Sequence, residues 1–205
     1  MRVCPSAVIV LTAALAWGQC ALAGELTEAV RQRQSKIDAL LARWPAELPT
    51  EGRKELAALL TEMIDFSAMA KAALSNEWEH RGDAERRQYV AAFERLVRAS
   101  LVRRTDVYRV LDLRFSEETI RGSSGRVKTI VRSKKAETEI VYVFGQRDGS
   151  WRLVDLEMDG VSTTSNYRAQ FTRILAKNDF QGLLDRLLKR AAALEAEAAR
   201  AEGDT

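Results

Sequence analysis

Apolar residues recur every three or four positions over the first half of the chain, which predicts amphipathic helices. The predicted helices cover about residues 26–44, 56–63, 66–74 and 83–108. Pro45 and Pro49 end the first of them, because proline cannot continue a helix. Asp65 is expected to cap the third, since its carboxylate can accept hydrogen bonds from first-turn amides.

Beyond about residue 110 the apolar period changes from near 3.6 to 2, which predicts a sheet. Four antiparallel strands are expected, with Asp148-Gly149 as the clearest hairpin turn. One face of this sheet is predicted to be apolar, with Leu111, Leu113, Phe115, Val127, Thr129, Val131, Ile140, Tyr142, Phe144, Val154, Leu156 and Met158. The other face would carry Val141, Val143, Trp151 and Leu153 and would therefore need cover.

Two more helices are predicted at 162–177 and 180–199, and they are the segments available to cover that second face. The first follows directly from a strand through Asp159-Gly160, with Ser162 as its expected cap. Beyond about residue 191 little remains to bury, so the tail is expected to fray. The mature chain, residues 24–205, thus reads as one α+β domain.

The amino end has the pattern of a secretory signal. Arg2 precedes an apolar run over 7–17, and Ala21-Leu22-Ala23 places small residues where a signal peptidase reads them. Residues 1–23 are therefore predicted to be cleaved. The apolar run is too short to span a bilayer, so the mature protein is expected to be exported and not membrane-spanning. A lipidated Cys20 is a minor alternative.

Charge and cysteine content exclude several function classes. One of the 32 Lys and Arg residues lies in the predicted signal, which leaves 31 against 29 Asp and Glu. This balance gives no electrostatic case for nucleic-acid binding. Both cysteines, Cys4 and Cys20, precede residue 24, so the mature chain has no thiol for a disulfide, a nucleophile or a metal.

No catalytic, metal or cofactor site is predicted. His80 is the single histidine and is surrounded by charged neighbours, as at a solvated helix end. Asp155, Glu157 and Asp159 alternate along one strand, where solvated charges are more common than acid–base pairs. The glycines mark turns, and none forms a phosphate-binding loop.

Two sets of residues are candidates for binding. Basic side chains alternate along the second strand and could dock an anionic headgroup, a membrane surface or an acidic partner, although a solvated face is the simpler interpretation: Arg126, Lys128, Arg132 and Lys134. The second set is apolar and from its spacing alone is the core: Phe66, Met69, Trp78, Tyr89, Phe93, Leu96, Val97, Tyr142, Phe144, Met158, Val161, Tyr167 and Phe171.

Three segments resemble, in order and spacing, the MlaC family, the toluene-tolerance auxiliary component of an ABC transport system. They are IDFSAMAKAAL followed by EW, then ERRQYVAAFERLV, and WRLVDLEMDGVSTTSNYRAQFTRIL. The most specific part is GVS-x-x-x-NYR-x-QF, Gly160 to Phe171. The resemblance covers about residues 26–188.

The resemblance implies a periplasmic phospholipid shuttle between an outer-membrane lipoprotein complex and an inner-membrane ABC transporter, maintaining outer-membrane lipid asymmetry. It also implies a helical layer on a curved sheet around an apolar cavity, which would make the apolar set a lining. Thr163-Thr164 and Ala73-Leu74-Ser75 depart from the family pattern and leave a hopanoid or other isoprenoid lipid open. A ligand-free envelope adaptor and, with less support, a pocket-containing enzyme are the rival functions.

Overall fold

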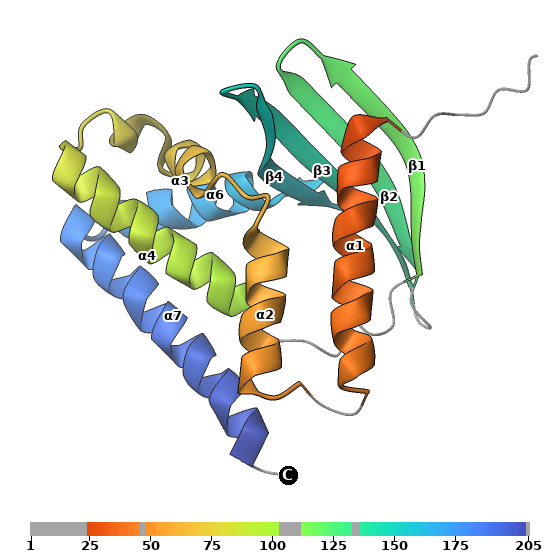
Figure 1. Cartoon of the computed structure of the whole chain (residues 1–205). Coiled ribbons are helices and arrows are strands. Elements are labelled where there is room, and N and C mark those ends of the chain that lie inside the picture. Colours follow the sequence, from red (N-terminus) through yellow and green to blue (C-terminus); the bar gives the residue numbers. More distant parts are fainter. Residues whose placement is uncertain (1–23, 46–47, 103–111, 133–135, 204–205) are drawn as a thin grey trace, which may run out of the picture.

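The computed structural model describes residues 24–45, 48–102, 112–132 and 136–203 (Figure 1). The first half of the chain forms helices α1 (Glu25–Arg43), α2 (Thr50–Thr61), α3 (Phe66–Leu74), a 3₁₀ turn (Ser75–Trp78) and α4 (Asp83–Val102). Strands β1 (Asp112–Arg121), β2 (Ser124–Arg132), β3 (Glu137–Arg147), β4 (Ser150–Met158) and β5 (Val161–Ser162) follow, and α6 (Thr163–Leu175) and α7 (Phe180–Gly203) end the chain. The predicted α+β class is confirmed, and the predicted end of the α4 helix near 108 falls outside the described residues.

The sheet is antiparallel with strand order β1-β2-β3-β4-β5, so each strand pairs with its neighbour in sequence. The prediction of four strands was wrong by one. β5 has only two residues, Val161 and Ser162, which pair with Met158 and Glu157. Two residues cannot show an alternating pattern, so this strand has no periodic signal. The tight turn before it needs positive φ at Asp159 (47°) and Gly160 (78°).

A β-bulge in β4 changes which face its first half presents. Val143 pairs with Asp155, but the next residue, Phe144, pairs with Leu153, so Val154 is the extra residue. A one-residue slip moves every following side chain to the opposite face. Leu153 and Trp151 therefore lie on the same face as Phe144 and pack with it. Their predicted place on the other face was wrong, and this face, called the inner face below, is the one that α1 covers.

The last two helices do not cover the outer face of the sheet, contrary to the prediction. α7 packs along α4, and α6 packs against α3 and the β4 end of the sheet, so the helices lie together on one side (Figure 1). Ala191 and Leu194 are buried, and Arg95 forms a bidentate pair with Glu195 (2.9 and 2.6 Å). The predicted boundary near residue 191 thus falls inside a helix that continues to Gly203.

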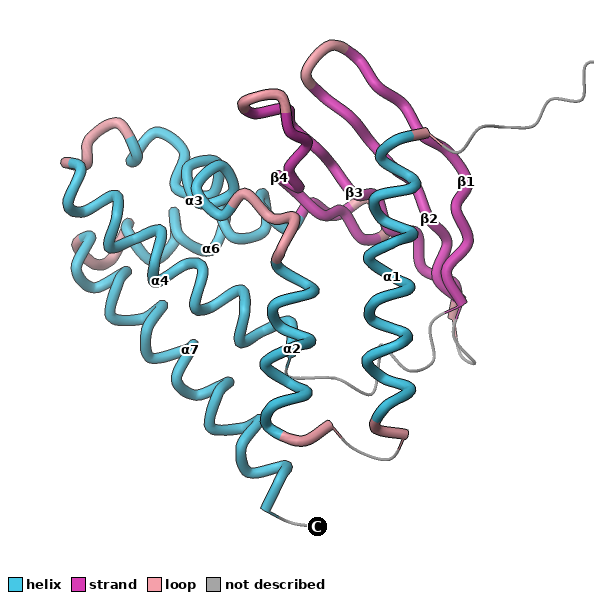
Figure 2. The backbone as a smooth tube through the Cα atoms, in the orientation of Figure 1, coloured by secondary structure: helices cyan, strands magenta, loops and turns pink. Residues whose placement is uncertain are grey.

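The buried apolar residues form three clusters, and the largest lies within the helices α3, α4, α6 and α7. A second lies between the C-terminal half of α1 and α2, where Ile37 and Leu40 join Leu56. The third lies between α1 and the sheet, where Leu26 and Val30 meet Val127 and Phe144. The tube in Figure 2 shows the same division, with the helical group and the sheet as separate bodies and α1 lying across β1 and β2.

The segment between α2 and α3 ties the two bodies together. Ile64 forms a parallel bridge with Leu153, made by hydrogen bonds from Leu153 N to Met63 O (2.8 Å) and from Asp65 N to Leu153 O (2.9 Å). Asp65 also caps α3 by accepting from Ala68 N (2.9 Å), which confirms its predicted role. Its second oxygen pairs with Arg147 (3.0 Å) in the β3–β4 hairpin. One residue thus starts a helix and holds it to the sheet.

Candidate functional site

The structure divides the thirteen predicted lining residues into three groups. Nine belong to the helical cluster: Phe66, Met69, Trp78, Tyr89, Phe93, Leu96, Val97, Tyr167 and Phe171. Tyr142 and Phe144 belong to the cluster between α1 and the sheet. Met158 and Val161 are 48% and 61% exposed at the β4–β5 edge. The thirteen residues thus have three different surroundings, and their role as a ligand lining stays a prediction.

The aromatic side chains of the helical group pack mainly against one another. Phe93 is fully buried, with its ring centroid 5.2 Å from that of Tyr167 and 6.2 Å from that of Phe171. Tyr89 is equally buried and donates its hydroxyl to Ala70 O (3.2 Å), and burial raises its pKa. Edge-to-face contacts at these distances are typical of a packed aromatic core. Ligand contact by these residues stays a prediction.

An apolar strip runs along the inner face of the sheet toward its β5 edge. It consists of Tyr142, Leu156, Ile140, Met158 and Val161, which the register places side by side through the pairs Tyr142–Leu156, Ile140–Met158 and Met158–Val161. Exposure rises along it: the first three are half-buried, whereas Met158 and Val161 are exposed. We call these five residues the inner strip. The described helices leave Met158 and Val161, at the β5 end of the strip, exposed.

Sequence reasoning named Tyr142, Met158 and Val161 as lining but omitted Ile140 and Leu156. The signal for both was present, since each alternates with a named residue along the same strand and so shares its face. Tyr142 is the polar member of the strip. Burial raises its pKa to about 12, and a hydrogen bond with Thr129 opposes that rise in part.

Asp155 joins the strip to α6. Its carboxylate accepts hydrogen bonds from the Ser162 hydroxyl, from Thr164 N (3.0 Å) and from Thr164 Oγ1 (2.8 Å), while Ser162 itself caps α6 by accepting from Ser165 N (3.0 Å). The cap at Ser162 was predicted. The reading of Asp155 as a solvated charge was not correct, because this carboxylate fixes where the sheet ends and the helix begins.

Replacing Asp155 with Ala is expected to lower the free energy of unfolding by about 1–3 kcal/mol, since several donors lose a charged acceptor. Urea denaturation of the purified protein measures this loss. Asp112→Ala is the matched control, because Asp112 is an exposed strand aspartate bonded only to Arg114 within the described residues. A loss as small as the control's, within about 0.5 kcal/mol, would show that Asp155 does not hold the seam.

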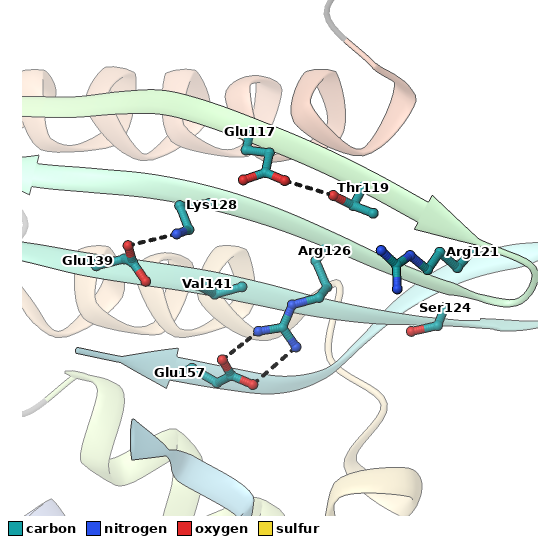
Figure 3. A pocket seen from close by; sticks show the side chains of 9 residues that line it. All are labelled: Glu117, Thr119, Arg121, Ser124, Arg126, Lys128, Glu139, Val141 and Glu157. Carbon is teal, nitrogen blue, oxygen red and sulfur yellow. Dashed lines mark hydrogen bonds and ion pairs between the residues drawn. The ribbon is translucent and has the colours of Figure 1, made fainter. Parts of the chain in front are cut away.

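The basic stripe lies on the outer face, where each described member pairs with an acid on β3 or β4. Arg126 forms a bidentate pair with Glu157 (3.2 and 2.6 Å), Lys128 pairs with Glu139 (3.0 Å), and Arg132 pairs with Glu137. Lys134 lies outside the described residues. The first two pairs lie in an open hollow of about 370 Å³, which Val141 also lines. Figure 3 shows these two pairs. The stripe is therefore locally neutralised, which the sequence did not show because the acids come from other strands.

A second hollow, of about 450 Å³, lies between the start of α3, α4 and the β3–β4 hairpin. Its walls combine apolar side chains, including Ile64, Phe66 and Val90, with Arg147 and Arg152. Both arginines are engaged: Arg147 pairs with Asp65, and Arg152 donates to Glu62 O (3.1 Å). This hollow is therefore part of the junction between the helices and the sheet.

Chemically reactive groups are sparse. His80 is 67% exposed at its side chain, with Nδ1 3.9 Å from Glu77 Oε1. In the part of the chain that the structure describes, no three His, Cys, Asp or Glu side chains gather closely enough to hold a metal ion. Among the described helices, none is long and apolar enough to cross a membrane.

Comparison with known proteins identifies the family. Residues 26–189 match the family model described as MlaC protein. The chain belongs to the MlaC family. A solved structure, the phospholipid-binding protein from Ralstonia solanacearum in complex with a phospholipid, superposes with a TM-score of 0.70. It is 16% identical and covers 83% of this chain and 96% of its own, so the two chains share a fold. No curated protein matches the chain.

The two departures from the MlaC pattern have local structural roles. Thr164 is 4% exposed and donates to Asp155, so it belongs to the seam with α6. Ser75 ends α3 with φ 57°, a left-handed backbone conformation that glycine adopts at lower cost. These residues thus lie at the ends of helices, and the lipid class that the protein binds stays a prediction.

Proposed function

We propose that this MlaC family protein is a phospholipid carrier that holds acyl chains against the inner strip. The observation that carries the proposal is the row of half-buried and exposed apolar side chains from Tyr142 to Val161, on the face of the sheet turned toward the helices. An apolar surface left open at one end is unfavourable in water unless something covers it. A lipid chain matches its chemistry. The bound phospholipid named for the Ralstonia structure supports this choice.

The energetics of lipid transfer explain why such a surface is needed. Each buried CH₂ gains about 0.8 kcal/mol, so a phospholipid does not cross water with its acyl chains exposed. A carrier must cover the chains, and it needs no catalytic group to do so. Release then requires a partner that favours a conformation with lower lipid affinity, because a ligand leaves a tight site only when the equilibrium is shifted.

We further propose that the protein works in the periplasm, between an outer-membrane lipoprotein complex and an inner-membrane ABC transporter, and so maintains outer-membrane lipid asymmetry. Membership of the MlaC family and the signal-like residues 1–23 support this assignment. The signal would be removed on export.

Solvent extraction of the natively purified mature protein tests the carrier function directly. Mass spectrometry of the extract is expected to find phospholipid in about one-to-one ratio with protein. An isoprenoid lipid in the same amount would replace phospholipid as the cargo. A lipid-free extract from folded protein, together with no uptake from phospholipid vesicles, would contradict the proposal and favour an adaptor without ligand.

The outer-face stripe is proposed as a docking surface for an acidic partner or an anionic headgroup. Arg126 and Lys128 already form ion pairs with Glu157 and Glu139, so a docking partner must replace these carboxylates. We therefore expect the stripe to contribute only modestly to binding. The triple change Arg126→Gln, Lys128→Gln and Arg132→Gln is expected to weaken binding to anionic vesicles several-fold, measured by co-sedimentation at low and high salt. Arg95→Gln, on the helical side, is the control. Equal binding by both variants would remove the stripe from the docking surface.

A further inference from the structure

Among the residues that the structure describes, Glu118 has no cationic partner. It lies on the inner face of β1, opposite Val127, and is half-buried beneath the start of α1. Its Oε2 accepts a hydrogen bond from Thr27 N (2.7 Å), in the first turn of that helix. Within the described ranges it forms no ion pair, although most other acids of the sheet do. A half-buried charge of this kind is unfavourable unless an opposite charge lies close.

Gly24 lies directly against this carboxylate. A Cβ built on Gly24 would be 1.9 Å from Glu118 Oε1 and 2.4 Å from Oε2, which leaves no room for a side chain. With standard bond lengths, the backbone nitrogen of Gly24 is within about 4.4 Å of Oε1. Gly24 N is also the atom that cleavage after Ala23 would turn from an amide into a free amine.

We propose that the amino terminus created by signal cleavage is a structural ion-pair partner of Glu118. The α-ammonium group of Gly24 would supply the missing cation, and Thr27 N would continue to donate to the other oxygen. The pair joins the first residue of the mature chain to the inner face of the sheet. It rests on the predicted cleavage after residue 23 and is independent of the lipid-carrier proposal.

The position of α1 fixes the terminus where the pair requires it. Leu26 is 1% exposed and packs closely on Gly125 of β2, where an added Cβ would be 2.3 Å from its Cδ1. Trp151 Nε1 donates to Glu25 Oε1 (2.5 Å), so β4 holds the same end of the helix. In Figure 1 the start of α1 lies over β1 and β2 accordingly. The amine is thus held against the sheet by contacts on both sides.

A positive charge at a helix amino terminus is otherwise unfavourable, because the peptide dipoles place partial positive charge there. Three acids offset this at α1: Glu25 and Glu28 in its first turn, and Glu118 across from it. Of these, Glu25 is bonded to Trp151 and Glu28 to Arg31 and Gln32, so Glu118 is the one left for the amine.

The pair would couple maturation to stability. Before cleavage Gly24 N is a neutral amide, and Glu118 lacks its counter-charge, so the precursor binds α1 to the sheet more weakly. After cleavage the same atom becomes charged and strengthens the attachment. The folded state is therefore expected to gain stability only once the chain has been exported and processed.

The test combines a chemical block of the amine with a change of its partner. The α-amino group titrates near pH 8 and lysine near 10.4, so mild acetylation at pH 6.5 modifies the terminus selectively, and peptide mass spectrometry confirms both the start at Gly24 and the site. Acetylation is expected to lower the melting temperature of the wild-type protein by about 2–4 °C. The Glu118→Gln variant has no carboxylate for the amine to pair with, so acetylation should change its melting temperature by less than half as much.

Glu117→Gln is the matched control, since Glu117 lies next in sequence but faces the outer hollow. Acetylation of this variant should reproduce the wild-type shift. An equal acetylation shift in wild type and Glu118→Gln would overturn the pair, as would a mature protein that begins at another residue. The carrier proposal is tested by the amount of bound lipid, whereas the ion pair is tested by melting temperature. Failure of one proposal is therefore distinguishable from failure of the other.

Discussion

Replacing Phe93 with Ala is expected to lower the free energy of unfolding by about 3–5 kcal/mol, the range for a buried aromatic residue whose cavity does not collapse. Phe93 is fully buried, and its ring packs against that of Tyr89 on the same helix and those of Tyr167 and Phe171 on α6. Urea denaturation of lipid-free protein measures the change. A loss of this size would identify the helical aromatic cluster as packed core.

The control is Met158→Ala, at the exposed end of the inner strip. Met158 is 48% exposed, so its truncation should change the free energy of unfolding by no more than about 0.5 kcal/mol. If Phe93→Ala were as mild as Met158→Ala, the ring of Phe93 would border open space, and the nine helical residues would return as candidates for the lining. The pair of variants therefore separates core from lining in this half of the molecule.

Local chemistry made several elements predictable from the sequence. Asp65 and Ser162 act as helix caps because a short polar side chain before an apolar helical run has few other roles. The change from period 3.6 to period 2 located the boundary between helices and sheet, because side-chain direction follows backbone geometry. These features depend on residues near one another in the chain, which is the range over which a single sequence is informative.

Features that depend on pairing between distant residues were not predictable. The bulge at Val154 moves Trp151 and Leu153 to the inner face, and nothing in their alternation marks it. The sequence shows Arg126 and Lys128 as a basic stripe, and only the folded sheet brings Glu157 and Glu139 within ion-pair distance of them. The candidate site was predicted as one apolar set for the same reason. Apolar spacing identifies a buried face but does not distinguish a face packed by protein from one left for a ligand.

Replacing Leu156 with Trp distinguishes those two possibilities on the inner strip. Leu156 is half-buried between Tyr142 on β3 and the seam with α6. If the space in front of it belongs to a lipid, the larger ring enters that space without strain. The lipid-free variant should then keep its free energy of unfolding within about 0.5 kcal/mol while losing bound phospholipid.

The expected loss of lipid affinity is tenfold or more, equivalent to at least about 1.4 kcal/mol, because an indole ring occupies the volume that an acyl chain would fill. Lipid per protein after solvent extraction and uptake from fluorescent phospholipid vesicles are the two measurements. A packed face gives the opposite result: overpacking lowers stability by about 1–3 kcal/mol, and lipid content follows only the folded fraction.

Ile130→Trp provides the matched control for this experiment. Ile130 is also a half-buried aliphatic residue of the sheet, but it lies on the outer face, opposite Glu139. It should retain lipid at the wild-type level, because the outer face faces away from the helices. Loss of lipid in both variants would point to a general disturbance of the sheet. Loss in Leu156→Trp alone, with stability preserved, would place the acyl chains on the inner strip.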